Sequence, residues 1–164
     1  MSIQYDVIII GAGAAGMMSA IEAGKRGRKV LLVDHYKKIG EKIRISGGGR
    51  CNFTNIHTNP NKFLSQNPKF VRSALSQYTQ NDFINLINKY EIKFHEKKLG
   101  QLFCDHSAQQ IVEMLLKECE LANVTIIKEF IIKNVTKEND QYLVSTETDK
   151  YSSQSLIIAT GGLS

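Results

Sequence analysis

The chain has 164 residues, of which 42% are hydrophobic and 23% charged, and its formal net charge is +5. This length favours one compact domain, residues 1–164, and this composition excludes disordered, collagen-like and membrane-embedded classes of protein. No apolar run approaches the ~20 residues that span a bilayer. The N-terminus also lacks the basic start of a signal peptide, so we expect a cytoplasmic protein.

The cysteines and histidines do not indicate a metal or redox site. Cys51, Cys104 and Cys119 are odd in number and widely spaced, which predicts reduced thiols rather than a disulfide framework or a CxxC motif. The histidines form no HExxH or HxH pair. We therefore expect no metal ion.

Positive charge is concentrated in residues 25–50, which hold nine lysines and arginines against two acidic residues. Such a stretch attracts phosphate in a nucleotide cofactor, a nucleic acid or a lipid headgroup. Tyr36 is the only aromatic residue of the stretch, so it offers no platform on which bases stack. We therefore expect a phosphate-bearing cofactor and neither a nucleic acid nor a membrane as partner.

The first elements predict a strand–helix–strand unit. Residues Tyr5–Ile10 form an apolar run typical of a parallel strand covered on both faces, Gly13–Arg26 favour a helix, and Val30–Asp34 predict a second buried strand. Residues 35–66 are polar, basic and rich in glycine, with no sustained period. They predict a long loop, which in a compact domain usually has a functional reason.

The middle of the chain predicts helices. Residues 68–79 and 82–90 favour two, the second with an apolar face repeating at helical spacing. Ser107 followed by Gln110 matches a capping box and predicts a helix whose apolar series continues to Cys119.

The last third predicts strands. Val124–Ile127 form a short strand, and Phe130–Ile132 lead through the polar turn Asn139-Asp140 into Tyr142–Thr146, which predicts a β-hairpin. Leu156–Ala159 predict a buried strand that runs into a Thr-Gly-Gly sequence. The whole pattern predicts an α/β fold, a Rossmann-like doubly wound sheet with a β-hairpin or meander inserted.

The first βα turn, Gly11-Ala12-Gly13-Ala14-Ala15-Gly16, matches GxGxxG between a strand and a helix. In this motif the first glycine makes the tight turn, the second lets the backbone approach a pyrophosphate and the third lets the helix pack close to the strand. The helix N-terminus then offers free N–H groups to phosphates. Met17 stands where a P-loop requires lysine, so a P-loop is excluded.

Asp34 ends the second strand at about the spacing expected for an acid that accepts hydrogen bonds from a ribose hydroxyl. The alternative, a solvated strand-end carboxylate, carries less weight. The fingerprint alone does not separate NAD from FAD, but a glycine-rich loop and a later hairpin in place of a prompt third strand favour FAD.

Ser46 to Asn52 contain three successive glycines followed by Arg50, Cys51 and Asn52. Bare backbone suits a flat or anionic ligand, and an arginine next to it suits phosphate or carboxylate. The alternative is a flexible surface loop, which would not require those side chains immediately after the glycines. Cys51, without a resolving partner nearby, is interpreted as a packing residue rather than a redox thiol.

Val7 to Gly16, Asp34 and Ile45 to Asn55 together resemble the bacterial aminoacetone oxidase family of FAD-binding enzymes, also described as BaiN-like flavoproteins. The resemblance covers the whole chain. It implies an FAD-dependent oxidoreductase that passes a hydride through flavin N5, with a nicotinamide cofactor, NAD(P)H, or oxygen as the other redox partner. The cofactor-binding residues we predict are Gly11, Gly13, Ala14, Ala15, Gly16, Asp34, His35, Lys42, Ser46, Gly47, Gly48, Gly49, Arg50, Cys51, Asn52, Ala159, Thr160 and Gly161. No catalytic acid or base is predicted.

Members of that family are longer and continue into an inserted β-rich domain and a segment that closes on the flavin. We therefore expect this chain to be an N-terminal portion, incomplete at its C-terminus and too short to be active alone. Two alternatives from other classes remain: a non-catalytic nucleotide-binding module, and an anion or nucleic-acid binder that uses residues 25–50. The substrate and the oligomeric state are not indicated.

Overall fold

The computed structural model describes residues 2–162 and divides into two compact units. The first unit comprises the residues up to Ile43 and those from Val112 onward, and the second comprises Arg44–Ile111. Each unit has its own sheet, one of six strands and one of three. Within residues 2–162, no helix is both long enough and apolar enough to cross a bilayer.

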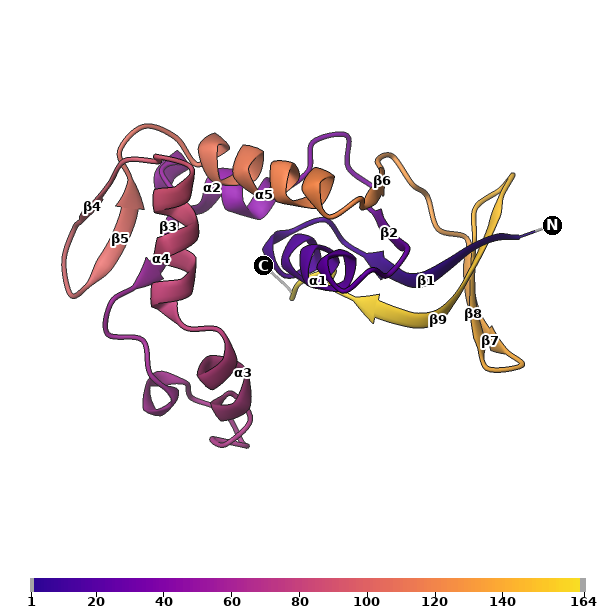
Figure 1. The fold of residues 1–164 in the computed structure, drawn as a ribbon, viewed down its shortest axis with the longest axis horizontal. Coiled ribbons are helices and arrows are strands. Elements are labelled where there is room, and N and C mark those ends of the chain that lie inside the picture. The colour runs from indigo at the N-terminus through magenta and orange to yellow at the C-terminus, as the bar shows by residue number, and fades with distance from the viewer. Residues whose placement is uncertain (1, 163–164) are drawn as a thin grey trace. The chain divides into compact units, whose positions relative to one another are not determined.

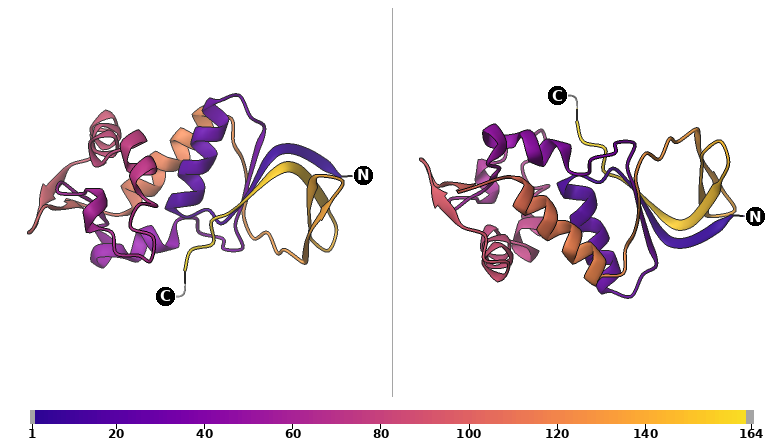
Figure 2. Two further views of the ribbon diagram at one scale, coloured as in Figure 1. Left: turned by 90° about the horizontal axis from the view of Figure 1, so that it is seen from below. Right: turned by 90° about the horizontal axis from the view of Figure 1, so that it is seen from above.

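The sheet of the first unit has the strand order β6-β2-β1-β9-β8-β7. Its parallel part consists of β6 (Thr125–Ile127), β2 (Val30–Val33), β1 (Ile3–Ile10) and β9 (Lys150–Ile158). In register, Ile8 of β1 lies beside Leu31 of β2 and Leu156 of β9. Figure 2 shows β1 and β9 running side by side in both views. The parallel, two-sided sheet that the sequence predicts is confirmed.

Two antiparallel strands, β7 (Asn134–Glu138) and β8 (Gln141–Ser145), extend this sheet beyond β9. Asn139 and Asp140 join them with φ angles of 48° and 60°. Those angles suit a tight hairpin turn whose twist matches that of its strands. The predicted hairpin is confirmed, and β9 makes it a three-stranded meander.

The core of the first unit follows from burial of both faces of the parallel strands. All four residues of β2 are buried, as are Ile8 and Ile9 of β1. Helix α1 (Ala14–Lys25) follows β1, and α5 (Gln109–Leu121) precedes β6 (Figure 1). Gly24 of α1 lies so close to Ala122 that a side chain there would meet the Ala122 carbonyl oxygen. The small residue therefore allows the end of α1 to approach the end of α5 closely.

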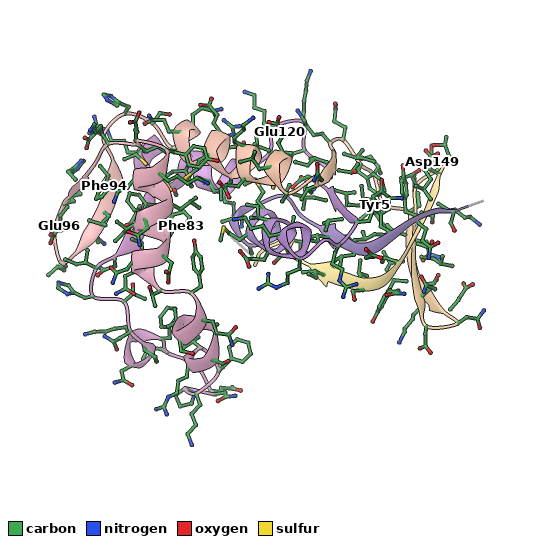
Figure 3. The ribbon with its side chains drawn as sticks, in the orientation of Figure 1. Tyr5, Phe83, Phe94, Glu96, Glu120 and Asp149 are labelled. Carbon is green, nitrogen blue, oxygen red and sulfur yellow. The ribbon has the colours of Figure 1, made fainter. Side chains whose placement is uncertain are left out.

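The second unit holds a three-stranded antiparallel sheet of order β3-β5-β4, formed by β3 (Asn52–Asn55), β5 (Gln101–Cys104) and β4 (Phe94–Glu96). Phe53 packs between Phe83 and Phe94, with ring centroids 6.0 and 5.4 Å away. Figure 3 labels Phe83 on α4 (Gln80–Lys89) and Phe94 on β4. These rings join the helix to the sheet.

The remaining elements of the chain are short. They are α2 (Glu41–Ile45), the 3-10 turns η1 (Ser46–Gly49) and η2 (Pro60–Lys62), and α3 (Arg72–Gln77). The structure confirms the two predicted helices at 68–79 and 82–90, the first one shortened to α3. Thr79 begins α4 with a capping box closed by Asp82.

Three local predictions are wrong. Residues 35–66 are not a continuous loop, because they contain α2, η1, β3 and η2. Phe130–Ile132 are irregular, and the hairpin strand begins at Asn134. The capping box at the start of α5 does not close: Ser107 Oγ accepts from the Gln109 N–H at 3.1 Å, while Gln110 Oε1 has no hydrogen-bond partner. The α5 helix itself is confirmed.

Candidate functional site

A cleft of about 830 Å³ opens in the first unit where β1, β2 and β9 end. Loops that follow parallel strands meet at one edge of the sheet, which is where α/β folds bind their ligands. The volume is within the ~300–1,000 Å³ usual for small-molecule sites. Ten predicted residues line it, namely Gly11, Gly13, Ala14, Ala15, Asp34, His35, Lys42, Ala159, Thr160 and Gly161. The first unit alone therefore forms a cavity of cofactor size.

The three glycines of the first turn have different surroundings. Gly11 has φ +104°, and a Cβ there would lie 2.5 Å from the Ala159 carbonyl oxygen. Gly16 is buried beneath the turn, where a Cβ would overlap the Gly11 carbonyl oxygen. Gly13 has φ −83° and ψ −168°, and a Cβ there would meet no atom within 4 Å. Packing within the chain therefore requires glycine at 11 and 16, and leaves open space at 13.

Helix α1 begins at this turn without a side-chain cap. Its N-cap is Gly13, which has no side chain to accept a hydrogen bond from the first N–H groups, and the first turn of the helix has no acidic residue. The first N–H groups of a helix have no partner within the helix, and the aligned peptide dipoles place partial positive charge there. The start of α1 therefore faces the cleft as a site suited to an anion.

Asp34 connects the glycine turn to the end of β2. Its Oδ2 accepts a hydrogen bond from the Ala12 N–H at 2.7 Å, and its Oδ1 accepts one from the Tyr36 N–H at 2.9 Å. The side chain is only 11% exposed, and His35 Nδ1 lies 3.5 Å from Oδ1. A carboxylate accepts about four hydrogen bonds, so Asp34 has acceptor capacity beyond these two for a ligand hydroxyl.

The strand end after β9 closes the other side of the turn. The Ala159 N–H donates to the Ile10 carbonyl oxygen at 2.8 Å, which continues the parallel pairing into the cleft. Lys42 Nζ donates to the Gly162 carbonyl oxygen at 3.2 Å. A positive charge therefore lies near Thr160 and Gly161, whose backbone lines the cleft.

One wall of the cleft is apolar and was not predicted from the sequence. It includes Phe130, Ile131, Ile132 and Ile158, and Ile158 is 63% exposed. The signal in the sequence was the apolar run Phe130–Ile132, which was assigned to the predicted β-hairpin. Phe130 is also part of the buried core and Ile132 packs against it, while Ile131 between them is 55% exposed.

Ser46 to Asn52 lie in the second unit, where local geometry explains their glycines. Gly47, Gly48 and Gly49 have φ angles of 57°, 67° and 86°, a region that side chains rarely adopt. The Gly49 carbonyl oxygen accepts from the Ala108 N–H at 2.7 Å. The triplet is therefore a defined turn rather than a flexible loop, and its role toward a cofactor stays a prediction.

The three cysteines are free and buried. Burial raises the pKa of Cys51, raises that of Cys104 to about 12 and raises that of Cys119 to about 11. Since the thiolate is the reactive form, these thiols are held in their unreactive state. Cys51 also helps to raise the pKa of Cys104, so the expectation that no second thiol lies near Cys51 is wrong. The burial of Cys51 still agrees with its interpretation as a packing residue.

The HI0933-like protein Rossmann domain is the family model that matches residues 5–164. The chain belongs to this family. Membership accounts for the parallel sheet and the glycine turn that the structure shows in the first unit. The narrower resemblance to aminoacetone oxidases stays a prediction within this Rossmann-domain family.

Two curated relatives of this HI0933-like domain carry the name "Ribosomal RNA dihydrouridine synthase". The Escherichia coli K12 protein is 54% identical over 161 residues, which are 98% of this chain and 40% of the relative. The Haemophilus influenzae Rd protein is 48% identical over 168 residues, 100% of this chain and 42% of the relative. The chain thus spans about two fifths of the length of these relatives.

Among solved structures, the halogenase PltM in complex with phloroglucinol and FAD is similar, with a TM-score of 0.57 and 18% identity. The match covers 94% of this chain and 34% of the halogenase. At this identity the likeness concerns the fold alone. It confirms the α/β architecture expected from the order of the elements.

Proposed function

We propose that the cleft of the first unit binds FAD and that the chain is the FAD-binding portion of an oxidoreductase. The observation that carries the proposal is Gly13, which lines the cleft yet has open space where its Cβ would be. A residue without a side chain at the N-cap of a helix suits the close approach of a pyrophosphate. No contact within the chain requires glycine there.

The neighbouring residues fit the other parts of a dinucleotide. The uncapped start of α1 would hold the pyrophosphate, and the remaining acceptor positions of Asp34 would take ribose hydroxyls. Lys42 would add positive charge beside Thr160 and Gly161, whose backbone borders the cleft. The apolar wall would cover ring surface of the bound cofactor. When bound, FAD supplies hydride transfer through its N5 atom.

The two relatives suggest the substrate of the longer protein. Their shared name supports the proposal that it reduces uridine in ribosomal RNA, a reaction that adds a hydride and a proton across the C5=C6 bond of uracil. The electron pair comes from an external donor, for which we propose NAD(P)H. Because the chain spans about two fifths of these relatives, this activity belongs to a protein of their full length.

Flavin binding by the chain tests the proposal. FAD is titrated into the purified protein while quenching of flavin fluorescence is followed, and absorbance is recorded after desalting. We expect saturable binding that Gly13→Val weakens at least tenfold, because the new side chain occupies the pyrophosphate position. The extended backbone at Gly13 accepts valine, so circular dichroism should show an intact fold.

Asp6→Asn is the control for a general effect of substitution in the first unit. Asp6 Oδ2 also accepts a backbone N–H, from Lys29 at 2.7 Å, but Asp6 is not one of the residues lining the cleft. Its FAD affinity should equal that of the unchanged chain. A folded chain that binds no FAD, or a Gly13→Val variant that binds it equally well, contradicts the proposal.

A further inference from the structure

The region between Glu41 and Asp82 contains no acidic residue. Within it, residues 56–78, which connect β3 to α4 (Figure 1), carry Lys62, Lys69 and Arg72. We call residues 56–78 the connecting segment. An unbalanced run of positive charge attracts an anionic partner.

The connecting segment has no buried residue, and every residue from 61 to 70 is exposed. It nevertheless holds large apolar side chains on the surface, with Leu64 98% and Phe70 78% exposed. Phe63 and Tyr78 are also exposed. The aromatic core of the second unit is formed instead by Phe53, Phe83 and Phe94. The rings of Phe63 and Phe70 are therefore exposed to a partner.

Short-range hydrogen bonds give the connecting segment a defined shape. Asn59 Oδ1 accepts from the Asn61 N–H at 3.0 Å, and Asn67 Oδ1 accepts from the Lys69 N–H at 3.2 Å. The Asn67 carbonyl oxygen accepts from the Phe70 N–H at 3.1 Å. Lys69 and Phe70 are thus placed next to each other on one turn.

We propose that the connecting segment binds single-stranded RNA, with Phe63 and Phe70 stacking on bases and Lys62, Lys69 and Arg72 contacting phosphates. Aromatic rings beside cations are the surface on which unpaired bases and their backbone bind. An apolar protein partner would leave the three cations without a role. The connecting segment would hold the ribosomal RNA whose uridine we propose is reduced, so its role rests on that proposed function. It departs from the expectation of no nucleic-acid partner, which considered only the basic stretch 25–50; the connecting segment carries the aromatic rings that this stretch lacks.

Fluorescence anisotropy with a labelled single-stranded RNA of about 12 nucleotides tests the inference on the 164-residue chain without FAD. We expect Phe70→Ala to weaken RNA binding roughly tenfold, because each base–aromatic stack contributes about that factor or more. The double variant Lys69→Ala/Arg72→Ala should lower the slope of log affinity against log salt by about 1.4, since each phosphate contact on a single strand contributes about 0.7.

Two matched controls lie in the first unit. Leu121→Ala removes an apolar side chain that is 60% exposed. Lys128→Ala/Lys150→Ala removes two positive charges, as Lys69→Ala/Arg72→Ala does, but from other exposed positions. Both should change RNA affinity less than about twofold, because surface positions outside the contact region contribute only through net charge.

Four results overturn the inference: no RNA binding by the unchanged chain, equal affinity of Phe70→Ala, equal loss in the controls, or binding to phosphatidylserine vesicles in place of RNA. FAD titration of the same variants separates the two proposals. A chain that binds FAD but not RNA contradicts only the RNA surface. A chain that binds RNA but not FAD contradicts the flavin proposal.

Discussion

Gly11, Gly13 and Gly16 are the same residue type, but the atoms around them differ. At 16 the fold requires glycine, because a Cβ would overlap the Gly11 carbonyl oxygen. Gly16→Ala should therefore lower the free energy of unfolding by about 3 kcal/mol, the upper end of the cost of overpacking. Gly13→Ala should change it by less than about 1 kcal/mol, since only the preference for glycine over alanine at an N-cap is lost. Urea unfolding of both variants measures the difference, and equal losses would contradict separate roles for the two glycines.

Asp34 stabilises the turn as well as offering acceptors to a ligand. Asp34→Ala leaves the Ala12 and Tyr36 N–H groups without their acceptor. Each hydrogen bond to a charged group contributes ~1.5–3 kcal/mol, so losing two should lower the unfolding free energy by about 3 kcal/mol, the low end of their sum. FAD affinity should fall at least tenfold. Chemical unfolding and FAD titration check the two effects, and unchanged affinity would rule out Asp34 as a cofactor ligand.

The buried thiol of Cys119 predicts a pH dependence. Burial raises its pKa from 9.0 to about 11, so the folded chain holds the neutral form more strongly than the unfolded chain does. This stabilising effect is complete below pH 9 and is lost as the pH rises toward 11. Urea midpoints should therefore fall more steeply above pH 9 in the unchanged chain than in Cys119→Ala. Parallel curves for the two proteins would contradict the prediction.

Among the elements, α1 and α5 are joined by an ion pair with one buried partner. Lys25 Nζ lies 2.8 Å from Glu118 Oε2, and their side chains are 49% and 2% exposed. Lys25→Met removes the cation from a buried carboxylate, a change that costs ~3–5 kcal/mol for fully buried pairs. Solvent screening at the half-exposed lysine reduces the expected loss to about 1–2 kcal/mol.

The exposed pair of Arg26 and Glu22 provides the control for this ion pair. Their side chains are 67% and 44% exposed, so Arg26→Met should cost less than about 0.5 kcal/mol. Unfolding free energies of the two variants and of Lys25→Met/Glu118→Met give the comparison. Equal effects of Lys25→Met and Arg26→Met would show that burial of Glu118 does not strengthen the pair.

Elements formed by residues close in the sequence were predicted, whereas elements that depend on pairing with distant residues were missed. β1, α1 and β2 were predicted because an apolar run, a glycine turn and a helical pattern lie within one short stretch. β3 was missed because its four residues pair with β5, which comes some fifty residues later. The polar half of β9 was missed because Ser152 and Ser153 are buried between β1 and β8, and serine carries no strand signal.

The candidate site shows the same division. The glycine turn and Asp34 were predicted, since each has a fixed place relative to a parallel strand. The Ala159–Gly161 strand end was predicted from the family resemblance. The apolar wall was not, because the apolar run Phe130–Ile132 was assigned to a hairpin strand, whereas these residues are irregular and line the cleft. In the second unit, the exposure of Phe63 and Phe70 depends on long-range packing of other aromatic residues, which composition alone does not reveal.

At the scale of the whole molecule, every residue that lines the cleft belongs to the first unit. The two segments of the first unit that flank residues 44–111 lie close together, because a Cβ on Gly40 would be 2.9 Å from Val112 Cγ2. A short Gly-Ser linker in place of residues 44–111 therefore spans the gap, because a flexible linker reaches ~5–6 Å times the square root of its residue number.

A chain with that linker should bind ADP, which carries the adenosine and pyrophosphate of FAD, with an affinity within about threefold of the unchanged chain, because the phosphate and ribose contacts are retained. Its FAD affinity should be at least tenfold lower if Ser46 to Asn52 contact the cofactor, as the sequence predicts. Calorimetric titration with ADP and FAD measures both, with circular dichroism as the check on folding. Loss of ADP binding by a folded protein would show that the cleft of the first unit is not sufficient for the nucleotide, and equal FAD affinity would remove Ser46 to Asn52 from the cofactor site.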